Sequence, residues 1–491
     1  DENFILMMLY PTLATLDDAS NRIPYLAESW ETSADGLTHT IKTRQGFLWE
    51  DGQPLTAKDV KFTADFEKAN KFSWRAGLVD AVASMDTPDD YTLVVTMSEP
   101  VGTFITDFTF WYRIMPQHVW QPLSDAKTFP NETPIGAGPF KFSRWEKAQF
   151  VELEARKDYA FPPAGHAPYV DKVVYRIFPD ANTLVLAFQN GDIDEVPDGV
   201  PVDSVDAIKS NPDFEVIHNP STGYDHVSPN IAGNQHLADV KVRQALASGI
   251  DKETIVKFLL KGYGGAMTTI TSPVLKDWVN PEVQDWPFDL DAGKKLLDEA
   301  GYVDTDGNGV RNAPADRGGA DLEFRLSYAS TDPIHQKLAP ILKENWEKLD
   351  IKINLDAQEG NALYDRVRFD HDFDLWISWW GITDNPPFNY YNFLHSTQYV
   401  SGSNNFIGLK DQAFDDLILK AYREGNLDTA KDLVKQLQVM EHDLVPLFPL
   451  YYREFNLAYN KTRWQGFKVL PGALLGIASW QSLVNVSQVG E

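Results

Sequence analysis

The segment 373–394, FDLWISWWGITDNPPFNYYNFL, constrains the fold of this chain more than any other stretch. Large side chains recur along it with the period of two residues that is typical of a β-strand. The odd-numbered residues from Phe373 to Trp379 are expected on one face of the strand, and Trp376 and Trp380 on the other. The sequence therefore predicts a sheet with a strand that carries aromatic side chains to its end.

The residues after this strand predict a loop. Gly381 breaks the alternation, and Pro386 and Pro387 follow shortly after it. Proline has no backbone N–H and fixes φ, so this stretch is interpreted as a loop and not as a helix. An aromatic strand end followed by such a loop is typical of a rigid scaffold that presents a binding surface. The segment contains no pair of residues that indicates catalysis.

Composition excludes several classes of protein. A chain of 491 residues is too long for one hydrophobic core, so two or three domains are expected. The net charge of −27 argues against binding to nucleic acid or to anionic membranes, and it favours solubility. The absence of cysteine excludes disulfides, thiolate catalysis, iron–sulfur clusters and zinc ribbons. The sequence contains no run of 18 apolar residues, so it predicts no membrane-spanning helix.

Enzyme signatures are missing from the sequence. It contains no HExxH, no GxSxG and no Walker loop, and its ten histidines have no metal-ligand spacing. The acidic pairs at 89–90 and 415–416 are interpreted as solvated surface. A glycoside hydrolase needs only two carboxylates, which can lie far apart in the sequence, so a carbohydrate-active hydrolase stays as a minor alternative. We expect a protein that is not an enzyme.

Strand and helix patterns alternate along the whole chain, which predicts a mixed α/β to α+β fold. Thr56 and Asp59 form the outline of a capping box, and Asp251 is the expected N-cap of another helix. The main predicted helices are one that opens at 56–59 and those at 180–188, 240–248, 252–261, 291–300, 332–346, 411–422 and 428–440, and the main predicted strands are 38–42, 92–97, 151–155, 172–178, 351–355 and 450–459.

The order of short motifs resembles the family 5 solute-binding proteins of ABC importers, which are the oligopeptide- and dipeptide-binding type. The matching segments extend over nearly the whole chain. They are PYLAESW at 24–30, DGL at 35–37, WEDGQPLTAKDV at 49–60, PIGAGPFKF at 134–142, GDID at 191–194, VKVRQA at 240–245, IDK at 250–252, AGY at 300–302 and LYYR at 450–453. Each motif is weak alone, but so many in the expected order are a strong signal.

The resemblance implies a periplasmic-binding-protein-like fold, with two main lobes that close on a cleft and an extra inserted lobe. A ligand would be enclosed between lobes I and III by a hinge movement. The implied boundaries are 1–21, 137–232 and 448–491 for lobe I, 22–136 for lobe II, 233–447 for lobe III, and hinges near 231–235 and 445–449.

The resemblance also implies where a peptide would be held. In peptide-binding members, a carboxylate three residues after the strand tryptophan pairs with the α-ammonium group of the ligand. Trp380 matches that tryptophan and Pro387 matches the family's proline, which places Thr383 at the anchoring position. Asp384 would substitute only if the loop shifted its register. Because a charge-assisted contact to an ammonium contributes roughly 1.5–3 kcal/mol, this departure weakens the case for a peptide.

An oligosaccharide is the alternative ligand. The family has oligosaccharide-binding members, which segment 118–139 resembles more closely, and aromatic rings stack on sugars; this chain holds 14 tryptophans and 19 tyrosines. Trp380 is predicted to contact the ligand, Trp376 is as compatible with packing as with contact, and Trp379 is interpreted as core because it shares a face with Leu375 and Ile377. The full set of predicted ligand-binding residues is Trp376, Trp380, Thr383, Asp384, Asn385, Tyr390, Asn404, Asn405 and Phe406.

The segment 304–309, DTDGNG, resembles the first half of an EF-hand loop. Asp304, Asp306 and Asn308 stand at positions 1, 3 and 5, where a calcium loop needs oxygen ligands. Position 12, which needs a glutamate, is Ala315. A structural Ca²⁺ ion is therefore one hypothesis and a tight Asx turn is the favoured one. We expect no other cofactor.

These features together predict a monomeric extracytoplasmic receptor that hands an oligopeptide or an oligosaccharide to the permease subunits of an ABC importer. A chemoreceptor or a chaperone partner would share the fold and differ in the surface that docks. The sequence contains no signal peptide and enters a hydrophobic stretch, 4–10, directly after Asp1-Glu2-Asn3. We interpret this as a truncated start, in which any export signal would not be visible, and we expect the protein in the periplasm or attached to the cell surface as a lipoprotein.

Overall fold

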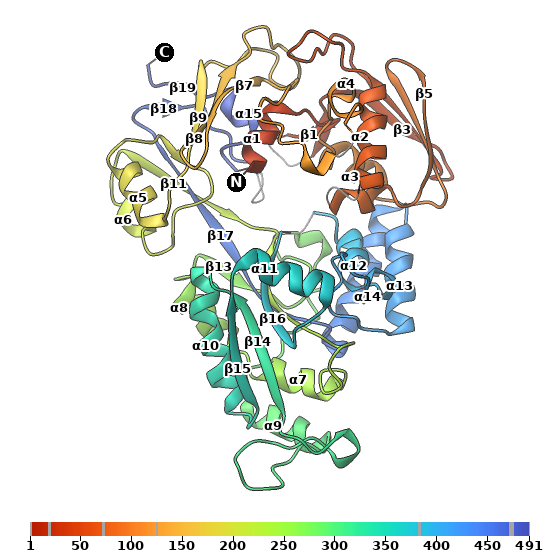
Figure 1. Ribbon diagram of the computed structural model, residues 1–491, viewed down its shortest axis with the longest axis vertical. Coiled ribbons are helices and arrows are strands. Elements are labelled where there is room, and N and C mark those ends of the chain that lie inside the picture. Colours follow the sequence, from red (N-terminus) through yellow and green to blue (C-terminus); the bar gives the residue numbers. More distant parts are fainter. Residues whose placement is uncertain are drawn as a thin grey trace. The chain divides into compact units, whose positions relative to one another are not determined.

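The chain forms two compact units of mixed α/β structure, which confirms the predicted fold class (Figure 1). The computed structural model describes residues 2–17, 21–70, 74–123, 126–381, 384–470 and 476–490. Unit 1 consists of Asp1–Asn219 and Phe455–Glu491, and unit 2 of Pro220–Glu454. The predicted lobe III, 233–447, lies inside unit 2. The division of unit 1 into lobes I and II, and the hinge positions, stay predictions.

Unit 1 contains two larger antiparallel sheets, with strand orders β3-β4-β6-β5 and β7-β8-β9, and the two-stranded antiparallel sheets β1-β2 and β18-β19, with helices around them. Its elements are α1 (Glu2–Leu9), β1 (Ala14–Leu16), β2 (Arg22–Pro24), β3 (Ala27–Thr32), β4 (Thr38–Thr43), α2 (Ala57–Asn70), β5 (Val82–Asp89), β6 (Thr92–Met97), α3 (Phe104–Trp111), α4 (Gln117–Trp120), β7 (Phe140–Glu146), β8 (Phe150–Ala155), β9 (Lys172–Arg176), α5 (Ala181–Gln189), β10 (Glu195–Val196), α6 (Val205–Lys209), β11 (Phe214–Pro220), β18 (Trp464–Gln465), α15 (Trp480–Leu483) and β19 (Ser487–Gln488).

Local sequence signals in unit 1 act as predicted. The Thr56 hydroxyl accepts a hydrogen bond from the Lys58 N–H at 3.3 Å, and the Asp59 carboxylate accepts one from the Thr56 N–H at 2.9 Å. These two bonds form the capping box at the start of α2. Gly36 adopts φ +70° in the turn between β3 and β4, a conformation that glycine tolerates best.

Unit 2 is built on a mixed sheet with strand order β17-β12-β16-β14-β15. Strand β14 pairs in parallel with β15 and β16, whereas β12 pairs antiparallel with β16 and β17. In Figure 1, α10 lies beside β14 and β15. The elements are β12 (Tyr224–Pro229), α7 (Val240–Ser248), α8 (Lys252–Leu259), β13 (Gly264–Ala266), α9 (Leu290–Glu299), β14 (Glu323–Ala329), α10 (Pro333–Glu347), β15 (Lys352–Gln358), α11 (Gly360–Asp365), a π-helical turn (Arg366–Asp370), β16 (Leu375–Trp380), α12 (Pro386–Leu394), α13 (Gln412–Arg423), α14 (Leu427–Leu444) and β17 (Phe448–Asn460), whose last residues belong to unit 1.

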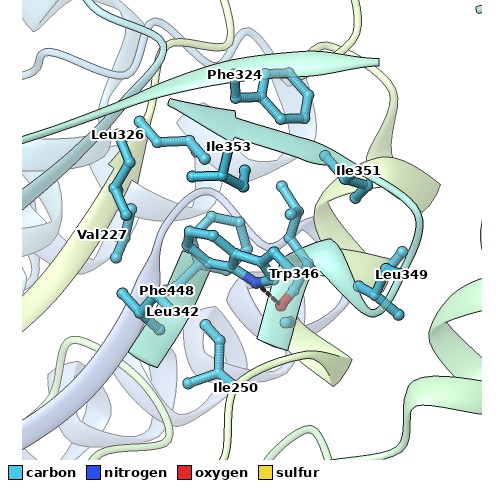
Figure 2. Close-up of a cluster of buried hydrophobic side chains, with 14 of the residues drawn as sticks. Val227, Ile250, Phe324, Leu326, Leu342, Trp346, Leu349, Ile351, Ile353 and Phe448 are labelled. Atoms are coloured by element: carbon cyan, nitrogen blue, oxygen red, sulfur yellow. Dashed lines mark hydrogen bonds between the residues drawn. The ribbon is translucent and has the colours of Figure 1, made fainter. Parts of the chain in front are cut away.

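Helix α10 supplies the centre of the core on one face of this sheet. Asp332 caps the helix by accepting hydrogen bonds from the N–H groups of Ile334 and His335, and Pro333 occupies the first turn. The apolar stripe at helical spacing ends at Trp346, which is fully buried. Its indole N–H donates to the Leu246 carbonyl at 2.9 Å (Figure 2). The core therefore holds its largest ring with packing and with a satisfied polar atom.

Candidate ligand-binding site

Strand β16, which contains the three tryptophans, has both faces covered. Leu375 and Ile377 belong to the core that contains α10, whereas Trp376 and Trp380 belong to a second core cluster. The predicted alternation is therefore correct within the strand. It is wrong for Phe373, which packs in the same cluster as Trp376, because the strand begins only at Leu375.

The loop predicted after β16 is partly a helix. Pro386 and Pro387 occupy the first turn of α12, and Asn385 is its N-cap, with a side chain that accepts a hydrogen bond from the Phe388 N–H at 3.4 Å. Proline is well suited to these positions because the first N–H groups of a helix have no intrahelical acceptor and φ is already helical. The interpretation that proline excluded a helix here was wrong. Asn385 was predicted as a ligand contact and is buried as the cap.

Trp380 is enclosed by other aromatic side chains and is only 7% exposed. Its ring stacks on Phe393 with a centroid distance of 4.1 Å and an interplanar angle of 14°. The His226 ring lies 4.0 Å away, and Tyr224 meets it edge-on at 6.0 Å. A sugar ring that stacks on Trp380 would have to displace one of these partners. Contact between Trp380 and a ligand stays a prediction.

Trp376 and Phe406 pack against each other inside unit 2. Their ring centroids are 5.3 Å apart in an edge-to-face arrangement, and both side chains are buried. Edge-to-face pairs of this kind stabilise a core beyond the area that they bury. This arrangement accounts for Trp376 and Phe406 as packing residues, and their predicted role in ligand contact has no support from it.

Trp379 was interpreted as core, but it is the most exposed tryptophan of β16. The indole lies against Gly223 and Gly381, where an added Cβ would come within 2.8 and 2.9 Å of its ring atoms. Its Nε1 is buried and has no hydrogen-bond partner among the described residues. The alternation correctly placed Trp379 on the same face of β16 as Leu375 and Ile377. It could not indicate how much of each ring on that face the rest of the protein covers.

The position expected to anchor a ligand amine cannot be placed. Thr383 lies outside the described residues, and the description resumes at Asp384, which is exposed. In the alignment that the resemblance implies, a threonine stands where peptide-binding members have a carboxylate. The predicted roles of Thr383 and Asp384 stay predictions.

Tyr390, another predicted contact, connects two helices. Its hydroxyl donates to Oε2 of Glu441 on α14 at 2.5 Å, and Oε1 of Glu441 accepts the Ile270 N–H at 2.8 Å. Burial raises the pKa of Glu441 to about 8, although both hydrogen bonds oppose this shift. The Tyr390 hydroxyl is thus engaged inside the protein.

The segment 404–406 forms a turn around a buried amide. Oδ1 of Asn405 accepts the N–H groups of Ile407 and Gly408, each at 3.1 Å, and its Nδ2 donates to the His395 carbonyl at 2.9 Å. Asn404 donates to the Asn392 side chain at 3.4 Å. These contacts account for Asn405 as a residue that stabilises the turn, and a ligand contact at Asn404 stays a prediction.

Sequence reasoning missed a buried ionic cluster in unit 2. Arg453 on β17 holds Asp225 on β12 with both Nε and Nη2, at 2.7 and 2.5 Å. His335 Nε2 lies 2.8 Å from the same carboxylate, and Asp332 lies 3.2 Å from Arg453. Arg453 was noticed only inside the motif LYYR. Three distant parts of the chain supply the cluster, so no spacing in the sequence reveals it.

The cluster keeps Asp225 ionised although the side chain is fully buried. Burial opposes ionisation, but the charge of Arg453 and the hydrogen bonds from His335 and Arg453 outweigh it, and the pKa of Asp225 lies below its ordinary value. Bidentate arginine–carboxylate geometry of this kind is the strong form of the interaction.

His226 is the second missed residue. It is fully buried beside Trp380, and neither ring nitrogen has a hydrogen-bond partner among the described residues. Burial lowers its pKa to about 3, which keeps the imidazole neutral at physiological pH. It packs as a neutral aromatic ring beside Trp380.

The segment predicted as half of an EF-hand loop is a hydrogen-bonded turn. Asp304 accepts the N–H groups of Gly307 and Gly309 at 2.7 and 3.0 Å, and Asp306 accepts that of Asn308 at 3.1 Å. The Asn308 amide nitrogen donates to the Asp321 carboxylate at 3.2 Å. These bonds are those of the Asx turn that the sequence favoured.

The described part of the chain contains neither a membrane-spanning helix nor a cluster of metal ligands. No helix in this part of the chain is long and apolar enough to cross a membrane. Within the same residues, no group of three or more histidine, aspartate or glutamate side chains is arranged to hold a metal ion.

Comparisons with known proteins agree with the motif order. The oligopeptide-binding protein AppA of Bacillus subtilis is 28% identical over 486 residues, which cover 96% of this chain and 86% of AppA. The structure of AppA in complex with a nonapeptide superposes with a TM-score of 0.86 at 26% identity, and the match covers 99% of this chain and 94% of AppA. NikZ from Campylobacter jejuni in complex with Ni(L-His) gives a TM-score of 0.83 at 26% identity and covers 98% of this chain and 94% of NikZ.

These relatives are binding receptors and not enzymes. Proteins of this type are extracytoplasmic. Residues 21–402, more than three quarters of the chain, match the model of one family. The chain belongs to the bacterial extracellular solute-binding proteins, family 5, which serve ABC transporters.

Proposed function

We propose that this chain is a non-enzymatic receptor that captures an oligopeptide outside the cytoplasm and delivers it to the permease of an ABC importer. The observation that carries the proposal is the similarity to AppA, which extends over nearly the whole chain in sequence and in structure. The Escherichia coli dipeptide-binding protein, 26% identical over 86% of this chain and 79% of its own length, supports the same ligand class. A monomer in the periplasm or on the cell surface fits this role.

A peptide is preferred over an oligosaccharide for a structural reason. The sugar hypothesis depended on an accessible Trp380, and that ring is packed between protein side chains. Members with other ligands exist, since NikZ was solved with a nickel–histidine complex. We therefore keep sugars and metal–amino acid complexes as arms of the test.

Calorimetry and thermal shift test the ligand class directly. The purified protein is titrated with di- to pentapeptides, with cello-, xylo- and manno-oligosaccharides, and with Ni(L-His). A ligand at 100 times its dissociation constant stabilises the folded state by roughly 2.7 kcal/mol. We expect stabilisation by peptides. Stabilisation by the sugars or by the nickel complex, with no response to peptides, would overturn the proposal.

The role in transport has its own test. The receptor should stimulate the ATPase of its cognate permease in proteoliposomes when a stabilising peptide is present, and it should elute as a monomer by light scattering with and without that peptide. Peptide binding without any stimulation would instead favour a chemoreceptor or a chaperone partner.

We propose further that the protein has no resident cofactor and that the loop 304–309 is a turn and not a calcium site. The hydrogen bonds of Asp304, Asp306 and Asn308 to neighbouring groups support this. After treatment with a chelator, addition of about 1 mM Ca²⁺ should leave the Tm unchanged, because even weak extracellular calcium sites are populated at that concentration. A rise of more than about 2 °C, lost in Asp304→Asn, would restore the calcium hypothesis.

A further inference from the structure

We propose that Trp379 contacts the ligand and selects for a cationic group on it, such as an ammonium or a guanidinium. The inference rests on the proposed function, since it assigns a role within ligand binding. It concerns the residue next to the one that the family resemblance indicates. The geometry of unit 2 distinguishes the two side chains.

The first support is the difference in accessibility along β16. Trp376 and Trp380 are 4% and 7% exposed, and other aromatic rings contact both. Trp379 is partly exposed, and no aromatic ring contacts it among the described residues. Of the three rings at this strand, only that of Trp379 leaves indole surface open without displacement of a neighbour.

The second support is the way in which the ring is held. Gly223 and Gly381 lie against the indole so closely that a side chain at either position would collide with it. Glycine permits this close approach because it has no Cβ. The ring is thereby held at the end of the strand against backbone, which keeps it in a defined position while part of it stays accessible. A ring that is fixed before binding loses little entropy when a ligand contacts it.

The third support is the unsatisfied indole nitrogen. Nε1 of Trp379 is buried and has no acceptor among the described residues. An indole nitrogen is a donor only, and a buried donor without a partner costs about 1–3 kcal/mol. Pairing of this N–H with a carbonyl oxygen of a bound peptide would remove that cost, and it requires the indole to turn slightly so that the nitrogen is uncovered.

The charge around the ring favours a cation. Trp379 stands directly opposite Asp225 on β12, and Asp225 stands opposite Tyr451 on β17, so the three share one face of the sheet. The buried cluster at Asp225 contains two carboxylates, Asp225 and Asp332, and one guanidinium, Arg453, whose formal charges sum to −1. A cation over an indole face gains about 0.5–2 kcal/mol.

The experiment is a cycle of protein variants and ligand pairs measured by calorimetry. The variants are Trp379→Phe, which keeps an aromatic face, and Trp379→Leu, which removes it. The first ligand pair is a lysine-containing tripeptide and the same tripeptide with norleucine in place of lysine. The second pair is a tetrapeptide with a free amino terminus and the N-acetylated form of that tetrapeptide. We expect Trp379→Leu to weaken binding of the cationic member of at least one pair by about 3- to 30-fold and Trp379→Phe to weaken it less. The neutral members should change by less than about 3-fold.

Trp145→Leu is the matched control, because Trp145 is an exposed tryptophan on β7 in unit 1. It should bind all four probes as the unaltered protein does, and circular dichroism should show that every variant is folded. Equal binding of the cationic probes by Trp379→Leu and the unaltered protein would overturn the inference, as would equal losses for cationic and neutral probes. Failure of the unaltered protein to bind any peptide would instead overturn the proposed function.

Discussion

Replacement of Arg453 by methionine is expected to lower the free energy of unfolding by about 3–5 kcal/mol, because it leaves the Asp225 carboxylate buried and unpaired. In the native protein Arg453 contacts Asp225 through two nitrogens and Asp332 through one of them. Only His335 would then remain to hydrogen-bond the Asp225 carboxylate. Urea denaturation followed by circular dichroism at pH 7 measures the loss.

Arg463→Met is the matched control for this prediction. Arg463 forms an ion pair with Asp194 at 2.8 Å, but both side chains are substantially exposed. Exposed pairs contribute only about 0–1 kcal/mol, so this variant should stay close to the unaltered protein. If Arg453→Met were no more destabilised than Arg463→Met, the buried cluster at Asp225 would not make the large contribution to the free energy of unfolding that we expect.

The pH dependence gives an independent check on Arg453. The pKa of Asp225 lies below its ordinary value in the folded protein, so its contribution to stability is present above the unfolded pKa and is lost as the pH falls through the folded pKa. Without Arg453, Asp225 can be protonated at higher pH. The deficit of Arg453→Met should therefore shrink toward pH 4, and a deficit that stayed constant from pH 7 to pH 4 would contradict this mechanism.

Glu441→Gln is expected to abolish a large decrease in the free energy of unfolding of unit 2 that occurs in the unaltered protein as the pH rises. Burial raises the pKa of Glu441 from 4.5 to about 8, so the folded state retains a proton that the unfolded state releases. The corresponding stability is fully present below pH 4.5 and is lost as the pH rises to about 8. A shift of this size corresponds to roughly 5 kcal/mol over that interval. As the pH rises, the free energy of unfolding of Glu441→Gln should therefore increase relative to that of the unaltered protein.

The control is Glu323→Gln, at an exposed residue whose partner is Lys352. The pKa of Glu323 lies below its ordinary value because of its hydrogen bonds to Lys352 and Asn354, so its pH dependence has the opposite sign. Parallel denaturation curves for Glu441→Gln and the unaltered protein between pH 4.5 and pH 8 would show that Glu441 is already ionised in the folded state.

Much of the local structure could be predicted from the sequence because it depends on neighbours along the chain. The cap at Asp251, the capping box at Thr56 and the helix 240–248 all stand where their residues indicated. The family could also be recognised from the sequence, because many weak motifs in a fixed order together make a specific signal. Pro386 shows the limit of local rules, because proline excludes a helix interior but suits a helix start, and only the cap at Asn385 decides between them.

The candidate site depended on tertiary structure. Alternation in β16 was correct, but which tryptophan stays accessible depends on what covers each face, and those coverings come from α10, α12 and β12. The cluster of Asp225, Asp332, His335 and Arg453 assembles from residues up to 228 positions apart. The sequence by itself therefore determined the elements, their caps and the family, because these depend on local order. Tertiary structure alone decided which rings are packed, which charges are paired and which side chain remains for a ligand, because those properties arise only when distant segments meet.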